Sequence, residues 1–253
     1  MNLSKDKHGF TIVELLIVIV VIGILAAITI VAFNGVTDKA RAAAAKSYAS
    51  QIKHRDIGDA QGYWNFDECT GTNLANTGGG ANSAGNTVTG TTAFSNDTPN
   101  GSGCSLSLNG TSYITTNIGL SNTYYSKSLW FKTNSGNAAM NLISDDTGGN
   151  QSAFYLNGQV PMAGHNGTWN MVKGTTKLND NKWHYAYLEF KANPSGTDGT
   201  LTLSIDGSIV GTKTDADTMS GANNQPSNVQ SIGAFGKNST FVGLIDDVMI
   251  VTK

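Results

Sequence analysis

The sequence predicts an α+β protein in which a long N-terminal membrane-spanning helix is followed by an all-β jelly-roll sandwich head. Residues 10–33 form an apolar run in which Glu14 is the only charged residue. Residues 34–57 continue that run with alanine and lysine, which favour helix. After Gly62, short segments with alternating apolar residues are separated by glycine and asparagine turns, a pattern that indicates a β-sandwich.

The composition narrows the class of protein before any motif is considered. The chain has 253 residues, which fits one or two domains, and its formal net charge is -2. This balance offers no polybasic surface, so no nucleic acid partner is expected for the head. Only 13% of the residues are charged and 30 are glycine, which excludes a coiled coil and a highly charged disordered chain.

The apolar run is long enough to cross a membrane, because a bilayer core requires about 20 apolar residues in a helix. A secretory signal would have a shorter apolar segment with its cleavage site after it. Residues 1–9 are short and polar, and the expected processing site, Gly9–Phe10, precedes the apolar run. Cleavage there leaves the hydrophobic helix on the mature protein.

The segment GFTIVELL, residues 9–16, resembles the class III signal of type IV pilins and pseudopilins. The resemblance implies that 1–9 is a leader removed by a prepilin peptidase after Gly9, and that Phe10 becomes a methylated N-terminus. It also implies that Glu14 pairs with the N-terminal ammonium of a neighbouring subunit during assembly, since a carboxylate in a membrane helix is costly unless it is neutralised. The alternative is an ordinary single-pass anchor. Many pilins have a proline where this sequence has Val31.

Residues 34–57 are expected to form a stem that packs against the head. The apolar residues recur four apart, at Val36, Ala40, Ala44, Tyr48 and Ile52. The basic residues lie largely away from this ladder and are interpreted as a solvated face, with lipid phosphate as the alternative ligand: Lys39, Arg41, Lys46, Lys53 and Arg55. Gly58 and Gly62 supply helix-stop and linker chemistry. The predicted domains are therefore the leader 1–9, the helix 10–59 with its transmembrane part 10–33, and the head 60–253.

The predicted strands of the head resemble those of the concanavalin A-like, laminin-G-type jelly roll. The matching pieces, in order, are YWNFDE, SLSLNG, SLWFK, KWHYAYLEF, TLSIDG and FVGLIDDVMIV. In TLTLSIDG, Leu201, Leu203 and Ile205 are expected on one face and Thr202 and Ser204 on the other. Further strands are predicted at SAFYLNG and QSIGAF.

This fold occurs in lectins, adhesion modules and glycanases, so the residues must decide between binding and catalysis. Retaining hydrolases of this fold place two carboxylates on one strand face, about 5 Å apart. The head has two glutamates, Glu68 and Glu189, and its adjacent Asp246 and Asp247 are expected to point to opposite faces. The sequence therefore predicts that the protein is not an enzyme.

Calcium is the metal that the acidic residues suit best, although no cofactor is required. Asp67, Glu68, Asp246 and Asp247 lie at the first and last strands, which are neighbours in this fold. The resemblance implies that Asp246 could hold a structural calcium ion with backbone carbonyls. The alternative interpretation is that these carboxylates are strand-end caps. The pair Asp145–Asp146 is interpreted as a polar turn in preference to a second calcium site.

Among the aromatic residues, Trp169 is the candidate ligand-binding residue, because it lies between turn residues and could stack on a sugar ring. Trp64, Trp130 and Trp183 lie inside predicted strands and are expected in the core. His165 and His184 have no partner histidine at metal-ligand spacing and are interpreted as structural.

Cys69 and Cys104 are the only cysteines, and they flank a glycine-rich stretch. A head outside the cytoplasmic membrane would form a disulfide between them, which would stabilise it by about 3–4 kcal/mol through loop entropy. A reduced pair is the alternative.

These observations together predict a structural subunit of a type IV pilus or related filament, whose head serves adhesion or surface binding. Its expected partners are other pilin subunits, the prepilin peptidase, the inner-membrane assembly machinery, and a glycan or surface protein. It would reside in the cytoplasmic membrane before assembly and then in an extracellular filament on a prokaryotic cell. The alternative is a pseudopilin or minor pilin of a secretion or DNA-uptake machine; a membrane-tethered glycan hydrolase is the third hypothesis.

Overall fold

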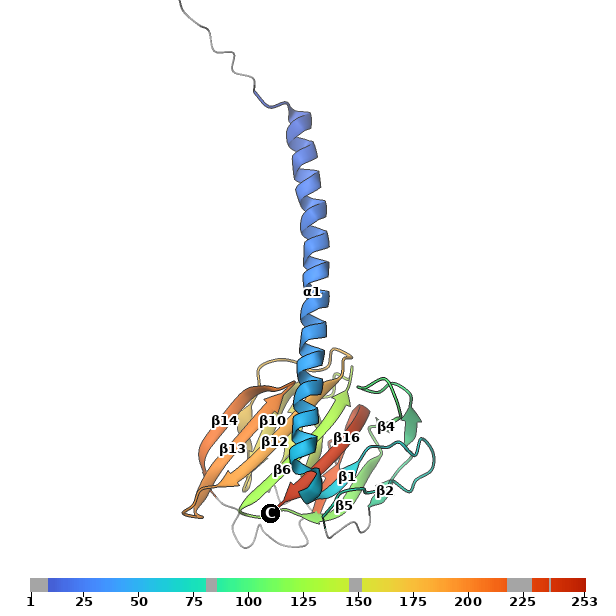
Figure 1. The fold of residues 1–253 in the computed structure, drawn as a ribbon, viewed down its shortest axis with the longest axis vertical. Coiled ribbons are helices and arrows are strands. Elements are labelled where there is room, and N and C mark those ends of the chain that lie inside the picture. The colour runs from blue at the N-terminus through green and yellow to red at the C-terminus, as the bar shows by residue number, and fades with distance from the viewer. Residues whose placement is uncertain (1–8, 81–85, 146–151, 218–228, 237) are drawn as a thin grey trace, which may run out of the picture. The chain divides into compact units, whose positions relative to one another are not determined.

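The computed structural model describes residues 9–80, 86–145, 152–217, 229–236 and 238–253. The N-terminal helix α1 (Ile12–Asp56) ends in a short 3₁₀ turn η1 (Ile57–Asp59), and strands follow (Figure 1). The strands are β1 (Ala60–Trp64), β2 (Thr87–Thr89), β3 (Ala93–Ser95), β4 (Ser105–Asn109), β5 (Tyr113–Gly119), β6 (Tyr124–Lys132), β7 (Ala139–Asn141), β8 (Ile143–Asp145), β9 (Phe154–Asn157), β10 (Val160–His165), β11 (Thr168–Lys173), β12 (His184–Ala192), β13 (Asp198–Ile205), β14 (Ser208–Asp217), β15 (Val229–Ile232) and β16 (Val242–Thr252). The predicted α+β organisation is confirmed.

The chain divides into two compact units, Met1–Ala43 and Ala44–Lys253. In the first unit, α1 runs without a break through Gly23 and Gly35. Thr11 caps its start, because the Thr11 hydroxyl accepts from the Glu14 backbone N–H at 3.2 Å while the Glu14 carboxylate accepts from the Thr11 N–H at 2.8 Å. The leader residues 1–8 lie outside the described part of the chain.

The second unit is a sandwich built from three antiparallel sheets. The large sheet has the order β14-β13-β12-β6-β16-β4-β3, and β1 pairs with β16. The two smaller sheets have the orders β11-β10-β9-β7 and β2-β5-β15-β8. The main core contains side chains from all three sheets, among them Leu106, Phe131, Leu203, Phe154 and Ile232.

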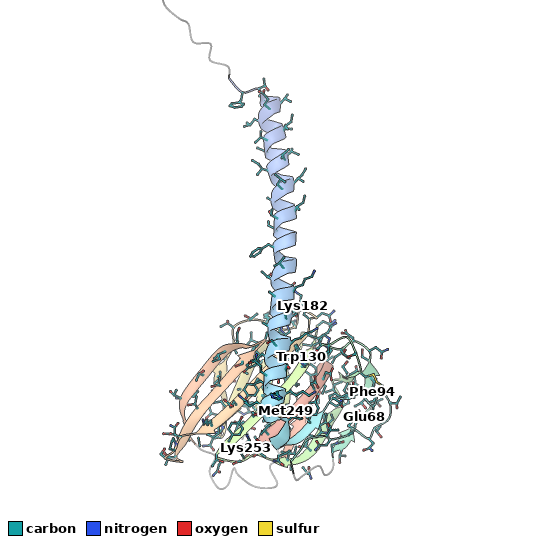
Figure 2. All side chains as sticks on the ribbon, in the orientation of Figure 1. Glu68, Phe94, Trp130, Lys182, Met249 and Lys253 are labelled. Carbon is teal, nitrogen blue, oxygen red and sulfur yellow. A yellow bond between two sulfur atoms is a disulfide. The ribbon has the colours of Figure 1, made fainter. Side chains whose placement is uncertain are left out.

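The last turns of α1 belong to this second unit and cover the outer face of the large sheet. Their buried apolar residues are Ala45 and Ile52, with Tyr48 and Ala49 half-buried beside them. They pack on a second apolar cluster that includes Trp130, Tyr185, Tyr187 and Met249 (Figure 2). The predicted ladder is therefore partly wrong. Val36, Ala40 and Ala44 are exposed, because steps of four residues rotate around a helix that has 3.6 residues per turn.

The start of the sandwich is fixed by β1 and by the disulfide. The predicted bond between Cys69 and Cys104 is confirmed, with Cα atoms 5.5 Å apart and a sequence separation of 35. The interpretation of Gly62 as a linker is wrong. It lies inside β1, where a Cβ atom would come within 2.5 Å of the Trp64 ring, so this position requires glycine.

The predicted strands correspond to strands of the structure, and several others were not predicted. The alternation in TLTLSIDG is confirmed on its apolar side, since Leu201, Leu203 and Ile205 are buried in the main core. On the other side, Ser204 is also buried. The strands missed from the sequence are short or irregular: β2, β3, β7, β8, β10 and β11.

Candidate functional site

The N-terminal part of α1 presents apolar side chains on every side. Phe10 is 91% exposed, and large exposed apolar residues follow at Ile12, Val13, Leu15, Leu16, Ile17, Val18, Ile19, Val20, Val21, Ile22, Ile24, Leu25, Ile28, Ile30 and Phe33. The segment has a mean hydropathy of 3.3 over its most apolar window, and none of that window is buried. Within the described residues, this helix is the one that is long and apolar enough to cross a membrane. Such a surface requires lipid or other protein chains to cover it.

Glu14 lies at the first turn of that apolar segment, as the sequence places it. Its carboxylate accepts hydrogen bonds from the Thr11 backbone and from the Thr11 hydroxyl, both at 2.8 Å. The carboxylate is therefore engaged within its own helix. Its pairing with a neighbouring subunit, and the processing at Gly9–Phe10, stay predictions.

Two basic residues near the end of α1 hold the helix to the sandwich. Lys53 contacts the Tyr63 hydroxyl and lies 3.5 Å from the Asp247 carboxylate, and Tyr63 in turn donates to Asp247. Arg55 pairs with buried Asp56 at 2.7 Å and contacts the Tyr187 hydroxyl.

Glu189 closes the second of these networks, since it accepts from Tyr187 at 2.8 Å and lies 3.5 Å from Arg55. The prediction of a wholly solvated basic face is therefore wrong at Lys53 and Arg55. The error arose because the sheet that pairs with them is far away in sequence.

Asp246 and Asp247 lie in a β-bulge of β16 that the sequence did not predict. The pairing of β16 with β6 shifts register between Asp246 and Met249, and Asp247 has a φ of 47°. Strict alternation fails there, so the expectation that the two carboxylates point to opposite faces is wrong. Both line one small cavity of about 130 Å³ together with Asp67. Burial, followed by the neighbouring Asp247 charge, raises the pKa of Asp246 to about 8.

A calcium ion at Asp246 stays a prediction, and the carboxylates around it have partners within the fold. The Asp246 carboxylate accepts from the Asp247 backbone N–H at 2.8 Å, and Asp67 accepts from the backbone N–H of Cys104 at 3.2 Å. Glu68 lies apart and accepts from the Ala75 backbone at 2.7 Å. Across the described ranges, no group of three or more His, Cys, Asp or Glu side chains has the arrangement of a metal site.

Trp169 lies on β11 at the edge of a smaller sheet and is half-buried. Its ring makes edge-to-face contacts with Phe235, at 4.4 Å between centroids, and with Tyr155, at 5.4 Å. The Tyr155 hydroxyl donates to Asn170. The result is a small aromatic cluster on the outer side of that sheet, with one indole only partly covered.

The other tryptophans divide between the two apolar clusters. Trp64 is in the main core and Trp130 lies under α1, as predicted. Trp183 is only half-buried, and its indole N–H donates to Asp97 at 2.8 Å.

A buried polar cluster inside the sandwich was missed from the sequence. Lys127 is fully buried, and its Nζ donates to the carbonyl and hydroxyl of Ser152 at 2.5 and 2.6 Å and to the Ile143 carbonyl at 3.1 Å. Asp145 is also fully buried and accepts from Gln230 at 2.7 Å, so its interpretation as a polar turn is wrong; Asp146 lies outside the described residues. Burial lowers the pKa of Lys127 to about 7, although the Asp145 charge opposes this.

His165 and His184 are both buried and hydrogen-bonded, as a structural role requires. His165 contacts the Tyr125 hydroxyl at 2.8 Å and the Asp217 carbonyl at 2.7 Å, and burial lowers its pKa to about 4. His184 lies between Asp206 at 2.8 Å and Asp180 at 3.0 Å.

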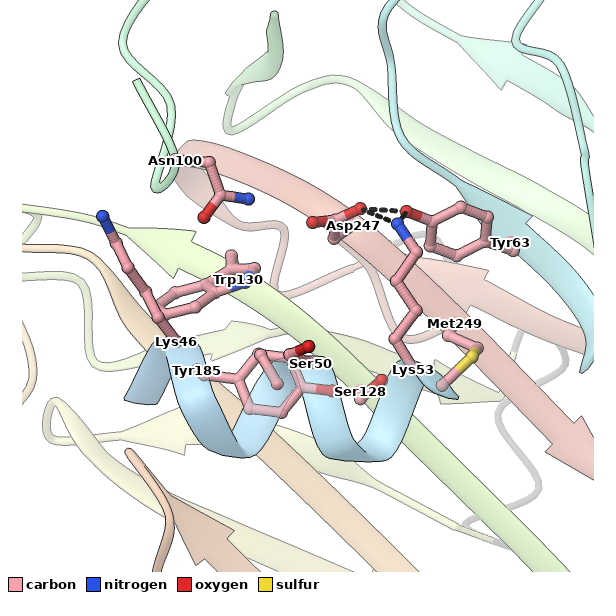
Figure 3. A pocket seen from close by; sticks show the side chains of 11 residues that line it. Lys46, Ser50, Lys53, Tyr63, Asn100, Ser128, Trp130, Tyr185, Asp247 and Met249 are labelled. Carbon is pink, nitrogen blue, oxygen red and sulfur yellow. Dashed lines mark hydrogen bonds and ion pairs between the residues drawn. The ribbon is translucent and has the colours of Figure 1, made fainter. Parts of the chain in front are cut away.

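A cavity of about 290 Å³ opens between the last turns of α1 and the large sheet, and we call it the junction pocket. Its wall combines residues of α1, the large sheet and the segment between the cysteines (Figure 3). They are Lys46, Ala49, Ser50, Lys53, Tyr63, Asn100, Ser128, Trp130, Tyr185, Asp247 and Met249. All of its lining residues belong to the unit Ala44–Lys253.

Two sequence families match this chain. Residues 108–253 match the concanavalin A-like lectin/glucanases superfamily, and residues 4–30 match the prokaryotic N-terminal methylation motif. The two matches lie on the sandwich and on the start of α1, which agrees with the two resemblances found in the sequence. No curated protein matches the chain.

Solved structures share the sandwich fold at low sequence identity. Domain 4 of AbnA, a GH43 extracellular arabinanase from Geobacillus stearothermophilus in complex with arabinotriose, is 22% identical with a TM-score of 0.56, over 77% of this chain and 92% of that one. The receptor binding domain of botulinum neurotoxin type G is 15% identical with a TM-score of 0.53, over 76% of this chain and 47% of that one. The binding domain of botulinum neurotoxin DC in complex with SialylT is 12% identical with a TM-score of 0.55, over 78% and 49%. This chain thus spans about half the length of the neurotoxin domains it matches.

Proposed function

The chain belongs to the concanavalin A-like lectin/glucanases superfamily, and we propose that it is a subunit of a type IV pilus or related filament that carries its sandwich as a binding head. One observation carries this proposal: the methylation motif at residues 4–30 coincides with a helix whose apolar side chains are exposed on all sides. The apolar side chains of a helix of this length are covered by a bilayer before assembly and by neighbouring helices afterwards.

The last turns of α1 support a division in which the first part of the helix serves assembly and the sandwich serves binding. They are already packed on the large sheet and held there by the Lys53 and Arg55 networks. The helix can therefore pass from lipid to filament through its first part while the head keeps its fold. In this proposal Gly9 is the processing residue, Phe10 the mature N-terminus, and Glu14 the residue that docks a new subunit.

Cell fractionation tests the assembly role. Filaments are sheared from cells that produce the chain, and its amount is compared between the sheared and membrane fractions. A strain without prepilin peptidase activity is the control. We expect the chain in the sheared fraction of the first strain alone. A processed but scarce chain that stays in the membrane would instead favour the pseudopilin or minor-subunit alternative. Equal amounts in both strains would contradict the proposal.

The head is proposed to bind ligands rather than to catalyse a reaction. Its two glutamates hydrogen-bond within the fold: one oxygen of Glu68 accepts from the Ala75 backbone N–H, and Glu189 accepts from Tyr187 and lies 3.5 Å from Arg55. The half-buried Trp169 with Phe235 offers an aromatic surface for a glycan or a surface protein. Structural neighbours that are named as complexes with arabinotriose or SialylT support a glycan ligand as the first to test.

Binding by the filament to a panel of immobilised glycans tests this role of the head. We expect retention on at least one glycan and a loss of about tenfold in affinity for Trp169→Ala. The matched control is Ile209→Ala, which removes an exposed apolar side chain elsewhere on the sandwich. Release of reducing ends from the panel would contradict a purely binding head, and equal binding by both variants would contradict the role of Trp169.

A further inference from the structure

The junction pocket has the size and the wall chemistry of a site for one small polar ligand. Its volume of about 290 Å³ is near the lower limit of ligand pockets, which is roughly 300 Å³. Its apolar wall comes from Ala49, Trp130 and Met249, and its polar wall comes from α1 and from the segment that the disulfide closes. It therefore combines one apolar side with hydrogen-bonding groups on the other.

At one end of the junction pocket the charged side chains neutralise each other. There Lys53, Asp247 and Tyr63 are bonded to one another, so the lysine and aspartate charges offset each other (Figure 3). The Asp247 side chain is 20% exposed and lines the cavity, so it can accept a hydrogen bond from a ligand. This end can therefore recognise a hydroxyl group but adds no net charge.

The other end has hydrogen-bonding capacity that the fold does not use. Lys46 and Ser50 are exposed on α1, and Asn100 is exposed on the facing segment. At the base, Ser128 is 1% exposed and lies beside Tyr185. Burial raises the pKa of the Tyr185 hydroxyl, and its hydrogen bond with Ser128 moderates that rise. The base is therefore closed by groups of the fold, and the groups open to a ligand are Lys46, Ser50 and Asn100.

The net charge of the pocket wall follows from these pairings. Since Lys53 and Asp247 offset each other, Lys46 is the remaining charge and favours a ligand with one negative group. The Ser50 hydroxyl, the Asn100 amide and the Asp247 carboxylate require a ligand that both donates and accepts hydrogen bonds. A bare inorganic anion has no apolar face for Met249 and Trp130. A sugar ring that bears a carboxylate has all three properties.

We propose that the junction pocket binds a single acidic sugar residue, a hexuronate, with its carboxylate at Lys46 and its hydroxyls at Ser50, Asn100 and Asp247. The site lies on the outer face of the large sheet under α1, apart from the Trp169 cluster on a smaller sheet. It does not depend on filament assembly, because every lining residue belongs to the unit Ala44–Lys253 of one chain.

Calorimetric titration of the full-length chain in detergent micelles tests this site, with D-galacturonate as the probe. D-galactose is the matched ligand without the carboxylate. We expect galacturonate to bind at least tenfold more tightly than galactose. Lys46→Gln should weaken galacturonate about tenfold while galactose is unchanged, and Lys46→Arg should restore most of the loss. Ser50→Ala should weaken both sugars without lowering the melting temperature, because Ser50 is exposed on α1 and lines the pocket.

The control is Lys173→Gln, which removes the same charge from an exposed position on β11, outside the pocket. It should leave galacturonate binding unchanged. Equal binding of acetate or inorganic phosphate would overturn the proposal, because the pocket would then recognise an anion without a sugar ring. No galacturonate binding by a folded chain, or an equal loss in Lys173→Gln and Lys46→Gln, would overturn it as well.

Discussion

The two parts of α1 have opposite relations to the rest of the molecule. From Ile12 to Phe33, apolar side chains are exposed around the whole helix, whereas from Ala45 to Ile52 they lie on one side and are covered by the large sheet. In the second part the spacing of Ala45, Tyr48, Ala49 and Ile52 keeps them on one face. One continuous helix thus has a part whose apolar side chains are covered within the chain and a part whose apolar side chains require lipid or other chains to cover them.

This contrast also separates what each part contributes to stability. The packed part contributes to the free energy of unfolding of the sandwich, because it buries apolar surface in the isolated chain. The exposed part contributes nothing until lipid or other subunits cover it. Substitutions in the two parts should therefore affect different measurements.

The largest effect is expected at Glu14, the one charge in the exposed part. Glu14→Ala should enter the membrane normally yet reduce the yield of sheared filaments at least tenfold, because an incoming subunit loses its docking partner. Quantitative immunoblots of both fractions measure this. Thr11→Ala, which removes the helix cap but keeps the carboxylate, is the control and should assemble at near-normal yield. Normal filament yield from Glu14→Ala would show that the carboxylate serves only as a cap.

The disulfide should matter to the packed unit alone. Replacing both Cys69 and Cys104 by serine should lower the free energy of unfolding of the sandwich by about 3–4 kcal/mol, because the bond restricts the unfolded chain over a separation of 35 residues. Thermal unfolding of the detergent-solubilised chain, followed by near-UV circular dichroism, measures the loss. Insertion in the membrane should not change. An unaltered melting temperature would mean that other contacts fix the segment between the cysteines.

A matched pair of substitutions compares the two parts of α1 directly. Ile52→Ala should destabilise the sandwich by about 2–3 kcal/mol, because Ile52 is only 3% exposed and its loss leaves a cavity. Ile22→Ala, at a position that is 58% exposed, should leave the melting temperature of the sandwich unchanged. Equal shifts for the two variants would contradict the division of the helix.

The smallest effect is expected from pH, and it arises inside the sandwich. Because burial lowers the pKa of Lys127 from 10.5 to about 7, the unfolded chain binds more protons than the folded one between these values. Lys127 should therefore contribute a rise of at most about 1.4 kcal/mol in the free energy of unfolding between pH 7.5 and 8.5. Asp246 opposes this rise, because its pKa in the folded chain is raised to about 8. Urea unfolding at the two pH values measures it. Lys127→Met should show a smaller slope; an unchanged slope would assign the effect to another group.

The sequence was sufficient for the features that depend on regular patterns. An apolar run of the length of a bilayer and alternating strands such as TLTLSIDG predicted both the helix and the sandwich. The strands that were missed are too short for alternation to show, as in β7 and β8, or contain Pro161 and Gly164, as in β10.

The site residues were harder to predict, because they depend on pairing between distant segments. The bulge at Asp247 has no signal in the alternation, so its carboxylate was placed on the wrong face. Lys53 and Arg55 looked solvated because their charged partners on the large sheet, Asp247 and Glu189, are more than 130 residues away in sequence. One signal was available: Lys127 has the same parity as Leu129 and Phe131 along β6, which places it on the core face.

The intact mass of the chain in sheared filaments tests the central claim most directly. If the exposed part of α1 is an assembly helix, the mature chain should begin at Phe10 and carry one added methyl group, with residues 1–9 removed. A chain that still carries residues 1–9, found only with the membrane, would contradict the claim and leave a tethered binding protein.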